Sequence, residues 1–181
     1  FERAGAQCIQ LEDQVSPKRC GHMDNKEVVE LKEAVRKIAM AVESRESDNF
    51  LIMARTDSRA THNLSEALHR GEAFLRAGAD ILFIEAPASV AEMEIIRQEF
   101  PDTILVANMV EEGKTPELPV SDLSDMGYQV ILRPISALLA VVKTLQQSYG
   151  ALLNDDIEAM RTISRLTFQE YNQVVKLSEH V

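Results

Sequence analysis

The sequence predicts an α/β fold of the barrel type, in which strands and helices alternate and the strands form a parallel sheet. Five short apolar runs alternate with helical patterns, as expected for parallel strands joined by helical crossovers. Each run ends in charged or amide residues, and parallel α/β folds bind ligands at the carboxyl ends of their strands. No glycine-rich phosphate turn follows any run, which disfavours an open doubly wound sheet with a single switch point.

The five runs have the features of buried strands. They lie within residues 3–12, 50–55, 76–85, 103–108 and 126–133. In three of them a helix end is followed by Gly5, Gly78 or Gly127, which we expect to adopt positive φ as helix C-caps. The other two are almost continuously apolar, as strands buried on both faces are. The residues that end the runs are Glu12, Arg55 with Asp57, Glu85, Asn108 and Arg133.

Helical patterns lie between the predicted strands. They cover residues 25–46, 64–77, 89–100, 120–126 and 135–153, and the tail at 155–180 contains one or two more. The first pattern places apolar side chains three or four residues apart, with Asp24 as its expected N-cap. Ser89 and Glu92 have the spacing of a capping box. We expect the tail to break near Leu166 and Thr167.

Composition limits the class of protein. The chain has 181 residues, of which 45% are hydrophobic, enough for one domain with a buried core. No apolar run is long enough to cross a membrane. The net charge of −10 argues against nucleic-acid binding, because phosphates require cations. Two cysteines cannot form a disulfide framework, so we expect a cytoplasmic protein. The chain starts at Phe1 without a leader, and we expect it to be part of a longer protein.

The loop after the first strand holds the densest group of reactive side chains. Residues 18–22 read Lys-Arg-Cys-Gly-His, and the neighbouring cations should favour the thiolate of Cys20. Gly21 allows the backbone to approach a ligand closely. A structural zinc site is disfavoured because no second Cys/His pair follows, and no cysteine lies at redox-motif spacing. The alternative is a polar surface loop with an incidental cysteine, and Cys8 is expected to lie in the core.

These motifs resemble the signature of the isocitrate lyase and phosphoenolpyruvate mutase superfamily. The segments that carry the resemblance are residues 11–14, 18–22, 54–57, 84–87, 107–116 and 134–138. The Lys-Arg-Cys-Gly-His block is typical of the lyase branch, whereas the phosphonomutases carry a loop without the cysteine. The resemblance implies a (β/α)₈ barrel that binds a 2-oxo or 2-hydroxy acid at its mouth through Mg²⁺, with Mn²⁺ as the other candidate metal.

The resemblance also implies roles for the residues of this loop. Cys20 matches the acid/base thiol that protonates the carbanion-like product. Lys18, Arg19 and His22 match residues that tune this thiol and bind carboxylate on a mobile loop, with Lys18 and His22 in catalytic positions. Gly21 matches a position that offers its backbone N–H to the substrate.

The strand ends match further positions of the same family. Arg55 matches the arginine that holds a substrate carboxylate, a bidentate task that lysine performs less well. Glu85 and Asn108 match substrate-orienting positions. Glu12 matches an acidic residue that reaches the metal through water. The family's Asp-x-Asp metal ligands belong to strands that would precede Phe1.

Two positions depart from the family pattern. Methylisocitrate lyases usually have an arginine where this chain has Leu139, which weakens the case for a tricarboxylate substrate. Arg133 stands where the family commonly has an aromatic residue or a histidine. It is expected either to bind an anion or to cover the barrel mouth.

We therefore expect residues 1–181 to form one incomplete barrel domain. Residues 1–134 would supply strands four to eight with their helices, and residues 135–181 the last barrel helix and a helical tail. A complete barrel typically has about 250 residues, so about three βα units are expected upstream.

The predicted function is that of a Mg²⁺-dependent carbon–carbon bond lyase. It would cleave a small 2-hydroxy di- or tricarboxylate of the dimethylmalate or methylisocitrate type by retro-aldol chemistry. The alternatives are an oxaloacetate hydrolase that releases oxalate and acetate, a carboxyphosphonoenolpyruvate mutase-like enzyme, and an inactive barrel fragment with an assembly role. Because family members exchange their last barrel helix, a homo-oligomer, either a dimer or a tetramer, is expected.

Overall fold

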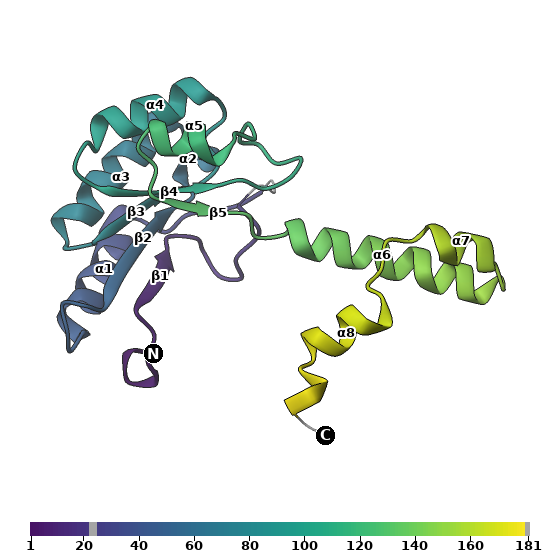
Figure 1. Cartoon of the computed structure of the whole chain (residues 1–181). Helices are drawn as coiled ribbons and strands as arrows, with labels where there is room; N and C mark the ends of the chain where they lie inside the picture. The colour runs from purple at the N-terminus through teal and green to yellow at the C-terminus, as the bar shows by residue number, and fades with distance from the viewer. Residues whose placement is uncertain (22–24, 180–181) are drawn as a thin grey trace. The chain divides into compact units, whose positions relative to one another are not determined.

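The computed structural model describes residues 1–21 and 25–179. The chain divides into two compact units, Phe1–Pro134 and Ile135–Val181. The first unit contains a parallel sheet whose strands lie side by side in the order of the sequence (Figure 1). The strands are β1 Cys8–Glu12, β2 Leu51–Thr56, β3 Ile81–Ile84, β4 Ile104–Asn108 and β5 Val130–Leu132. The predicted parallel α/β arrangement is confirmed, and each predicted strand is present.

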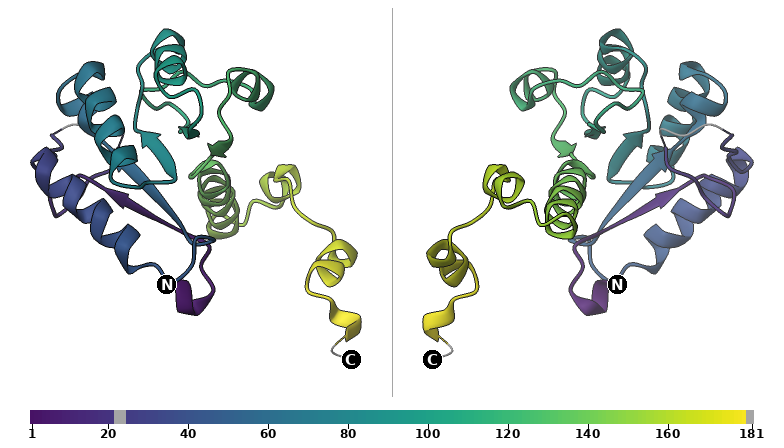
Figure 2. Two further views of the ribbon diagram at one scale, coloured as in Figure 1. Left: turned by 90° about the vertical axis from the view of Figure 1, so that its left-hand side faces the viewer. Right: turned by 90° about the vertical axis from the view of Figure 1, so that its right-hand side faces the viewer.

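Helices connect the strands and cover the outer side of the curved sheet, as Figure 2 shows for α1, α3 and α4. The helical segments of this unit are η1 Glu2–Ala4, α1 Leu31–Ser44, α2 Ser58–Thr61, α3 Leu64–Arg76, α4 Val90–Glu99 and α5 Val120–Asp125. Ile38 of α1, Phe74 of α3 and Ile96 of α4 are buried in one apolar cluster with strand residues such as Ile52 and Leu82. This cluster fixes the helices to the sheet.

The alternation of side chains along the strands separates the two faces of the sheet. Leu82 belongs to the cluster under the helices, whereas Phe83 belongs to a second buried cluster that Met53 also contacts. Arg55 follows Met53 by two residues, and Glu85 follows Phe83 by two. The charged residues at the strand ends therefore continue the face opposite the helices.

The three glycines that precede strands adopt the predicted helix-ending conformation. Gly5, Gly78 and Gly127 have φ of 89°, 97° and 94°. A residue with a Cβ is strained in this region, so glycine ends each helix or turn and lets the chain enter the next strand.

The first helix begins later than predicted. Residues 25–30 are not helical, and α1 starts at Leu31. Val28 instead pairs with Gln14 in an antiparallel bridge, and two backbone hydrogen bonds of 2.8 and 2.9 Å flank it. These long-range contacts override the helical spacing of the apolar side chains. The predicted N-cap, Asp24, lies outside the described residues.

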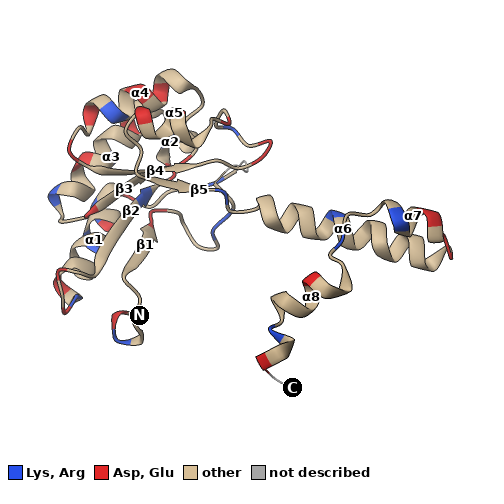
Figure 3. Cartoon of the chain, viewed as in Figure 1, with Lys and Arg blue, Asp and Glu red and all other residues tan. Residues whose placement is uncertain are grey.

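The second unit is helical. It comprises α6 Ser136–Leu153, α7 Ile157–Thr162, α8 Phe168–Val174 and η2 Leu177–Glu179. The predicted break near residue 166 is present, and Thr167 caps α8 in a capping box with Glu170. Figure 3 shows that α6 carries few charged residues along its length. In the part of the chain that the structure describes, no helix has the length and apolar character needed to cross a membrane.

Candidate active site

Polar side chains from four strand ends meet at the carboxyl edge of the sheet. The register of β1 and β2 places Glu12 beside Arg55, and their Oε2 and Nε atoms are 3.6 Å apart. Nη2 of Arg55 is 3.5 Å from Oε1 of Glu85. Asn108 donates from Nδ2 to both carboxylate oxygens of Glu85 at 3.2 and 3.3 Å. The structure thus brings together four of the strand-end residues that the sequence singled out.

Arg55 is the centre of this group. Only 9% of the residue is exposed, and its guanidinium lies over the Phe83 ring, 4.9 Å from the centroid. Nε and Nη2 donate to the two carboxylate oxygens of Asp57 at 2.9 and 3.2 Å. Burial by itself lowers the pKa of Arg55, but the carboxylates of Asp57, Glu85 and Glu12 outweigh it and raise the pKa above its usual value. The guanidinium is therefore a fixed, permanent positive charge.

Asp57 and Lys26 form a fully buried ion pair beneath Arg55. The Lys26 ammonium lies 3.0 Å from Oδ1 of Asp57, and their side chains are 1% and 0% exposed. Lys26 also donates to the backbone carbonyl of Gly21. Burial by itself raises the pKa of Asp57, but Arg55 and Lys26 outweigh it and hold the pKa below its usual range. Asp57 therefore stays charged and holds both cations.

A second buried network holds the backbone at the end of β2 from the helix side of the sheet. The Asp13 carboxylate accepts hydrogen bonds from the Thr56 hydroxyl at 2.7 Å and from the backbone N–H of Asp57 at 2.9 Å. Arg70 of α3 donates to the same carboxylate at 3.1 Å. Burial raises the pKa of Asp13, although these donors act in the opposite direction. The network fixes the backbone that carries Asp57 to both β1 and α3.

The loop that carries Cys20, of which the structure describes residues 15–21, lies against these strand ends. Gln14 forms two hydrogen bonds with the backbone of Arg19, in which Nε2 donates to the carbonyl and Oε1 accepts from the N–H, both at 2.9 Å. The Lys18 ammonium donates to the Glu12 carboxylate at 3.1 Å. Cys20 is exposed. His22, the remaining predicted residue of this loop, lies outside the described residues.

Gly21 is where the loop touches the strand-end cluster. A Cβ built at this residue would overlap the Glu85 carboxylate and lie 2.5 Å from Nη2 of Arg55. Only glycine allows this approach of backbone to paired charges. The Gly21 backbone thus approaches two of the predicted substrate-binding side chains, and its approach to a ligand stays a prediction.

Two of the strand-end side chains offer acceptors to a ligand in different ways. Oδ1 of Asn108 is buried and has no hydrogen-bond partner within the described residues, so it suits a hydroxyl donor. Oε1 of Glu12 is likewise buried without a hydrogen-bond partner within the described residues, while Oε2 of the same carboxylate accepts from Lys18 and faces Arg55.

A divalent cation does not fit the side chains of the described residues by themselves. Among residues 1–21 and 25–179, no group of three or more His, Cys, Asp and Glu side chains could hold a metal ion. Glu12, the predicted neighbour of the metal, pairs with Lys18 and Arg55. Direct ligands for Mg²⁺ would therefore have to come from other residues.

Arg133 has a local role that the sequence could not specify. Its Nη2 donates to the carbonyl of Leu118 at 3.0 Å, and Nη1 lies 3.8 Å from the Glu117 carboxylate. Both partners belong to the segment between β4 and α5. Arg133 thus ties β5 to this segment.

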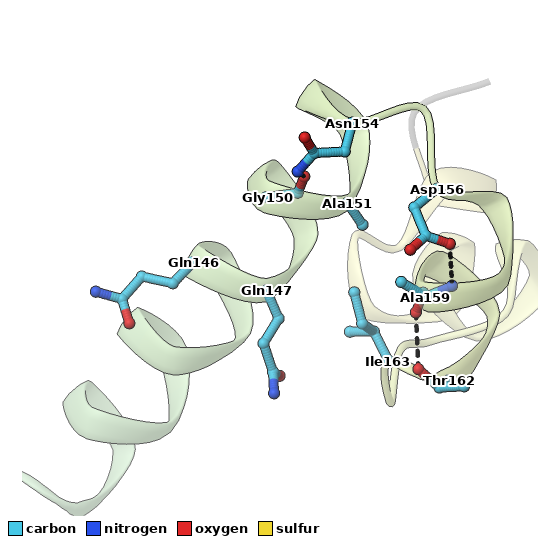
Figure 4. A pocket seen from close by; sticks show the side chains of 9 residues that line it. All are labelled: Gln146, Gln147, Gly150, Ala151, Asn154, Asp156, Ala159, Thr162 and Ile163. Carbon is cyan, nitrogen blue, oxygen red and sulfur yellow. Dashed lines mark hydrogen bonds between the residues drawn. The ribbon is translucent and has the colours of Figure 1, made fainter.

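A cavity of about 340 Å³ lies within the second unit (Figure 4), and none of the predicted site residues lines it. Its polar side chains serve the helices that line it. Asp156 accepts from the N–H of Ala159 at 2.8 Å, and Thr162 donates to the carbonyl of Ala159 at 2.8 Å. These contacts stabilise the start of α7 and its last turn.

Three residues of the site had weak or no signals in the sequence. Asp57 appeared only as a strand-end charge, while Gln14 and Lys26 had no assigned role. Gln14 belongs to the Glu-Asp-Gln run after the first strand, where consecutive polar residues next to a buried strand were the available signal. Lys26 fell inside a segment predicted to be helical, and nothing in its neighbourhood indicated burial.

Comparison with known proteins gives consistent matches. Residues 1–153 match the family model described as phosphoenolpyruvate phosphomutase. The chain is 44% identical over 179 residues to 2,3-dimethylmalate lyase of Eubacterium barkeri, which covers 99% of this chain and 62% of that protein. It is 39% identical over 181 residues to probable 2-methylisocitrate lyase 1 of Corynebacterium glutamicum, covering 95% of this chain and 59% of that protein.

A solved structure supports the same assignment of fold. It is a crystal structure of 2,3-dimethylmalate lyase, described as a PEP mutase/isocitrate lyase superfamily member, with a TM-score of 0.88 and 32% identity. The match covers 98% of this chain and 59% of that chain. The barrel-type fold is thereby confirmed, with this chain forming a curled, five-stranded part of it. The chain spans about three fifths of the length of these relatives.

Proposed function

Because the chain belongs to the phosphoenolpyruvate phosphomutase family, within the PEP mutase/isocitrate lyase superfamily, we propose that the full-length protein is a carbon–carbon bond lyase. Its substrate is a small 2-hydroxy di- or tricarboxylate of the dimethylmalate or methylisocitrate type. The relatives named as lyases support this reaction class. The full-length protein joins the strands of residues 1–134 to further strands in one barrel domain, with residues 135–181 as its last helix and tail.

One observation carries the proposal: the backbone at Gly21, next to Cys20, lies directly against the Arg55–Glu85 pair. The backbone next to Cys20 thereby lies beside a fixed guanidinium and oriented acceptors at the carboxyl edge of a parallel sheet, while Cys20 itself is exposed. This is the edge at which barrel enzymes carry out their chemistry. An incidental surface cysteine would not need a loop that only glycine can bring so close.

In the proposed reaction a base removes the hydroxyl proton of the substrate and the neighbouring carbon–carbon bond breaks. The electron pair of that bond passes to the departing fragment, which Cys20 protonates at carbon. Arg55 binds a substrate carboxylate, while Glu85 and Asn108 orient the rest of the molecule. Lys18, Arg19 and His22 tune the thiol and bind carboxylate, and Gly21 offers its N–H.

The proposal includes a divalent cation, Mg²⁺ or Mn²⁺, as the resemblance implies. When bound, it supplies Lewis-acid stabilisation of the oxo acid that forms. Its direct ligands would lie outside this chain, and Glu12 would approach it through water. The residues of this chain carry substrate binding and proton transfer.

We further propose that the protein works in the cytoplasm as a homo-oligomer, either a dimer or a tetramer, that exchanges its C-terminal helix. The two free cysteines support a reducing compartment. Exposed apolar side chains along α6 support the exchange, because such a surface is stabilised by burial against another subunit. They include Leu138, Val141, Val142, Leu145 and Leu152.

The test replaces Cys20 in the full-length protein. Cys20→Ser is expected to abolish cleavage of dimethylmalate and methylisocitrate, while the affinity for oxalate, measured by calorimetry, stays within about threefold. The matched control is Cys8→Ser, because Cys8 packs against the second apolar cluster on β1. Cleavage by Cys20→Ser at the parent rate would contradict the acid role. Turnover of oxaloacetate or phosphonopyruvate instead of these acids would overturn the proposed substrate class.

A further inference from the structure

The backbone on both sides of Cys20 is anchored to side chains from outside residues 15–21. On one side, Gln14 holds the N–H and the carbonyl of Arg19. On the other, the ammonium of Lys26 holds the carbonyl of Gly21. Cys20 itself is exposed. Its position is therefore set through its two neighbours.

The burial of Lys26 is costly, and its contacts show what this burial achieves. A cation away from water is stable only when it is paired and hydrogen-bonded. Asp57 supplies the counter-charge, yet Asp57 already receives two hydrogen bonds from Arg55. The further contact of Lys26 is with Gly21, so this lysine connects the Asp57–Arg55 pair to the loop.

The loop has few other means of holding this shape. A cavity of about 220 Å³ lies between the two arms of the loop, residues 14–19 and 25–27, with Gln14, Pro17, Arg19 and Lys26 among its lining residues. Because the arms do not pack closely there, apolar contacts cannot fix their separation. The backbone pairing around Gln14 and Val28 closes the base of the loop. The hydrogen bonds of Gln14 and Lys26 act further along it.

We propose that Gln14 and Lys26 are positioning residues that clamp the backbone on either side of Cys20. They thereby set where its thiol meets the substrate carbon. The proposal rests on the acid role of Cys20 proposed above and adds the residues that make this role possible. Neither side chain touches the reacting atoms.

The experiment uses the full-length protein and the variants Gln14→Leu and Lys26→Met, which keep side-chain bulk and remove the polar contacts. Each is expected to lower kcat by about 100-fold with KM changed less than about threefold, because a shift of about 1 Å in a catalytic group has this effect. Lys26→Arg keeps the charge and the donors and is expected to restore at least about tenfold of the loss. Gln7→Leu and Lys32→Met, at exposed positions, serve as matched controls with parent kinetics.

Amide hydrogen exchange supplies a readout that does not depend on turnover. The Arg19 N–H is bonded to Gln14, so its exchange in the free enzyme is expected to be about tenfold faster in Gln14→Leu. Lys26→Met is expected to speed exchange in the peptide that covers residues 18–21. These rates measure the clamp itself.

The outcomes separate the clamp from the proposed function. Parent-like kcat and exchange in both variants would overturn the clamp, and so would a rise in KM alone. If the parent enzyme cleaves neither acid, the proposed function fails, and the exchange rates still decide the clamp: faster exchange supports it and unchanged exchange overturns it. Should Lys26→Met not fold, Gln14→Leu decides by the same measurements.

Discussion

The contact between Gly21 and the strand ends leads to a prediction whose size follows from the geometry. In Gly21→Ala, the new Cβ would lie 2.5 Å from Nη2 of Arg55 and 2.5 Å from Cδ of Glu85, whereas ordinary contacts begin near 3.4 Å. Both neighbours are held in place, Arg55 by Asp57 and Glu85 by Asn108, so the loop has to withdraw by about 1 Å. A displacement of this size at a catalytic group lowers the rate by about 100-fold.

This factor corresponds to about 2.7 kcal/mol in the activation free energy. The folded state should be little affected, because Gly21 does not have positive φ and its outward movement strains only the hydrogen bond from Lys26 to its carbonyl, while the Lys26–Asp57 ion pair stays in place. We therefore expect Gly21→Ala to lose about 100-fold in kcat/KM while its Tm stays within about 2 °C. Steady-state cleavage assays and calorimetric unfolding of the full-length protein measure the two quantities.

A matched control adds the same methyl group elsewhere. A Cβ at Gly5 would meet nothing within 4 Å, but its φ of 89° strains any residue other than glycine. Gly5→Ala is thus expected to lower Tm by a few degrees and keep parent turnover, the reverse of the pattern for Gly21→Ala. If Gly21→Ala kept turnover within about threefold of the parent, the loop contact would not be part of the reactive arrangement.

Two further predictions concern stability. Asp57→Asn removes the shared partner of Arg55 and Lys26 and should cost about 3 kcal/mol at pH 7, measured by urea unfolding. Because the pKa of Asp57 is lowered in the folded state, its contribution is present above the ordinary pKa and is lost as pH falls through the folded value, so the difference between variant and parent should shrink below about pH 4; a constant difference would refute the charge argument. Asn63→Ala removes the N-cap of α3, whose side chain accepts from the Glu66 N–H at 2.9 Å, and should cost about 1 kcal/mol with an unchanged m-value.

The fold could be predicted because its determinants are local. Apolar runs, glycines at positive φ and helical spacing each act over a few residues, and parallel pairing then brings the strand ends to one edge. Glu12, Arg55, Glu85 and Asn108 could therefore be placed together before any contact was known. Where a local pattern competed with a distant partner, the prediction was wrong, as for residues 25–30.

The contacts that complete the site could not be predicted, because they join residues far apart in the chain. Asp57 pairs with Lys26 across 31 residues, and Asp13 with Arg70 across 57. Burial decides whether such charges are structural or solvated, and a single sequence does not report burial. The capping box illustrates the same limit locally: Ser89 accepts from the Glu92 N–H, but Glu92 turns to the N–H of Ala88 and to Arg59.

The charge balance of the site bears on what the proposed substrate requires. Within the described residues, the ion pairs around Arg55 and Asp57 join three carboxylates to three cations, and the six residues are Glu12, Asp57, Glu85, Lys18, Arg55 and Lys26. A dicarboxylate substrate adds two negative charges beside carboxylates that already face these cations, and most of these side chains are buried. Uncompensated charge at such a place is costly, so further positive charge has to accompany the substrate. Arg19 of the loop can supply part of it, and a divalent cation held by other residues would supply the rest. The divalent cation in the proposal is therefore supported by the charge of this chain's own side chains as well as by family resemblance.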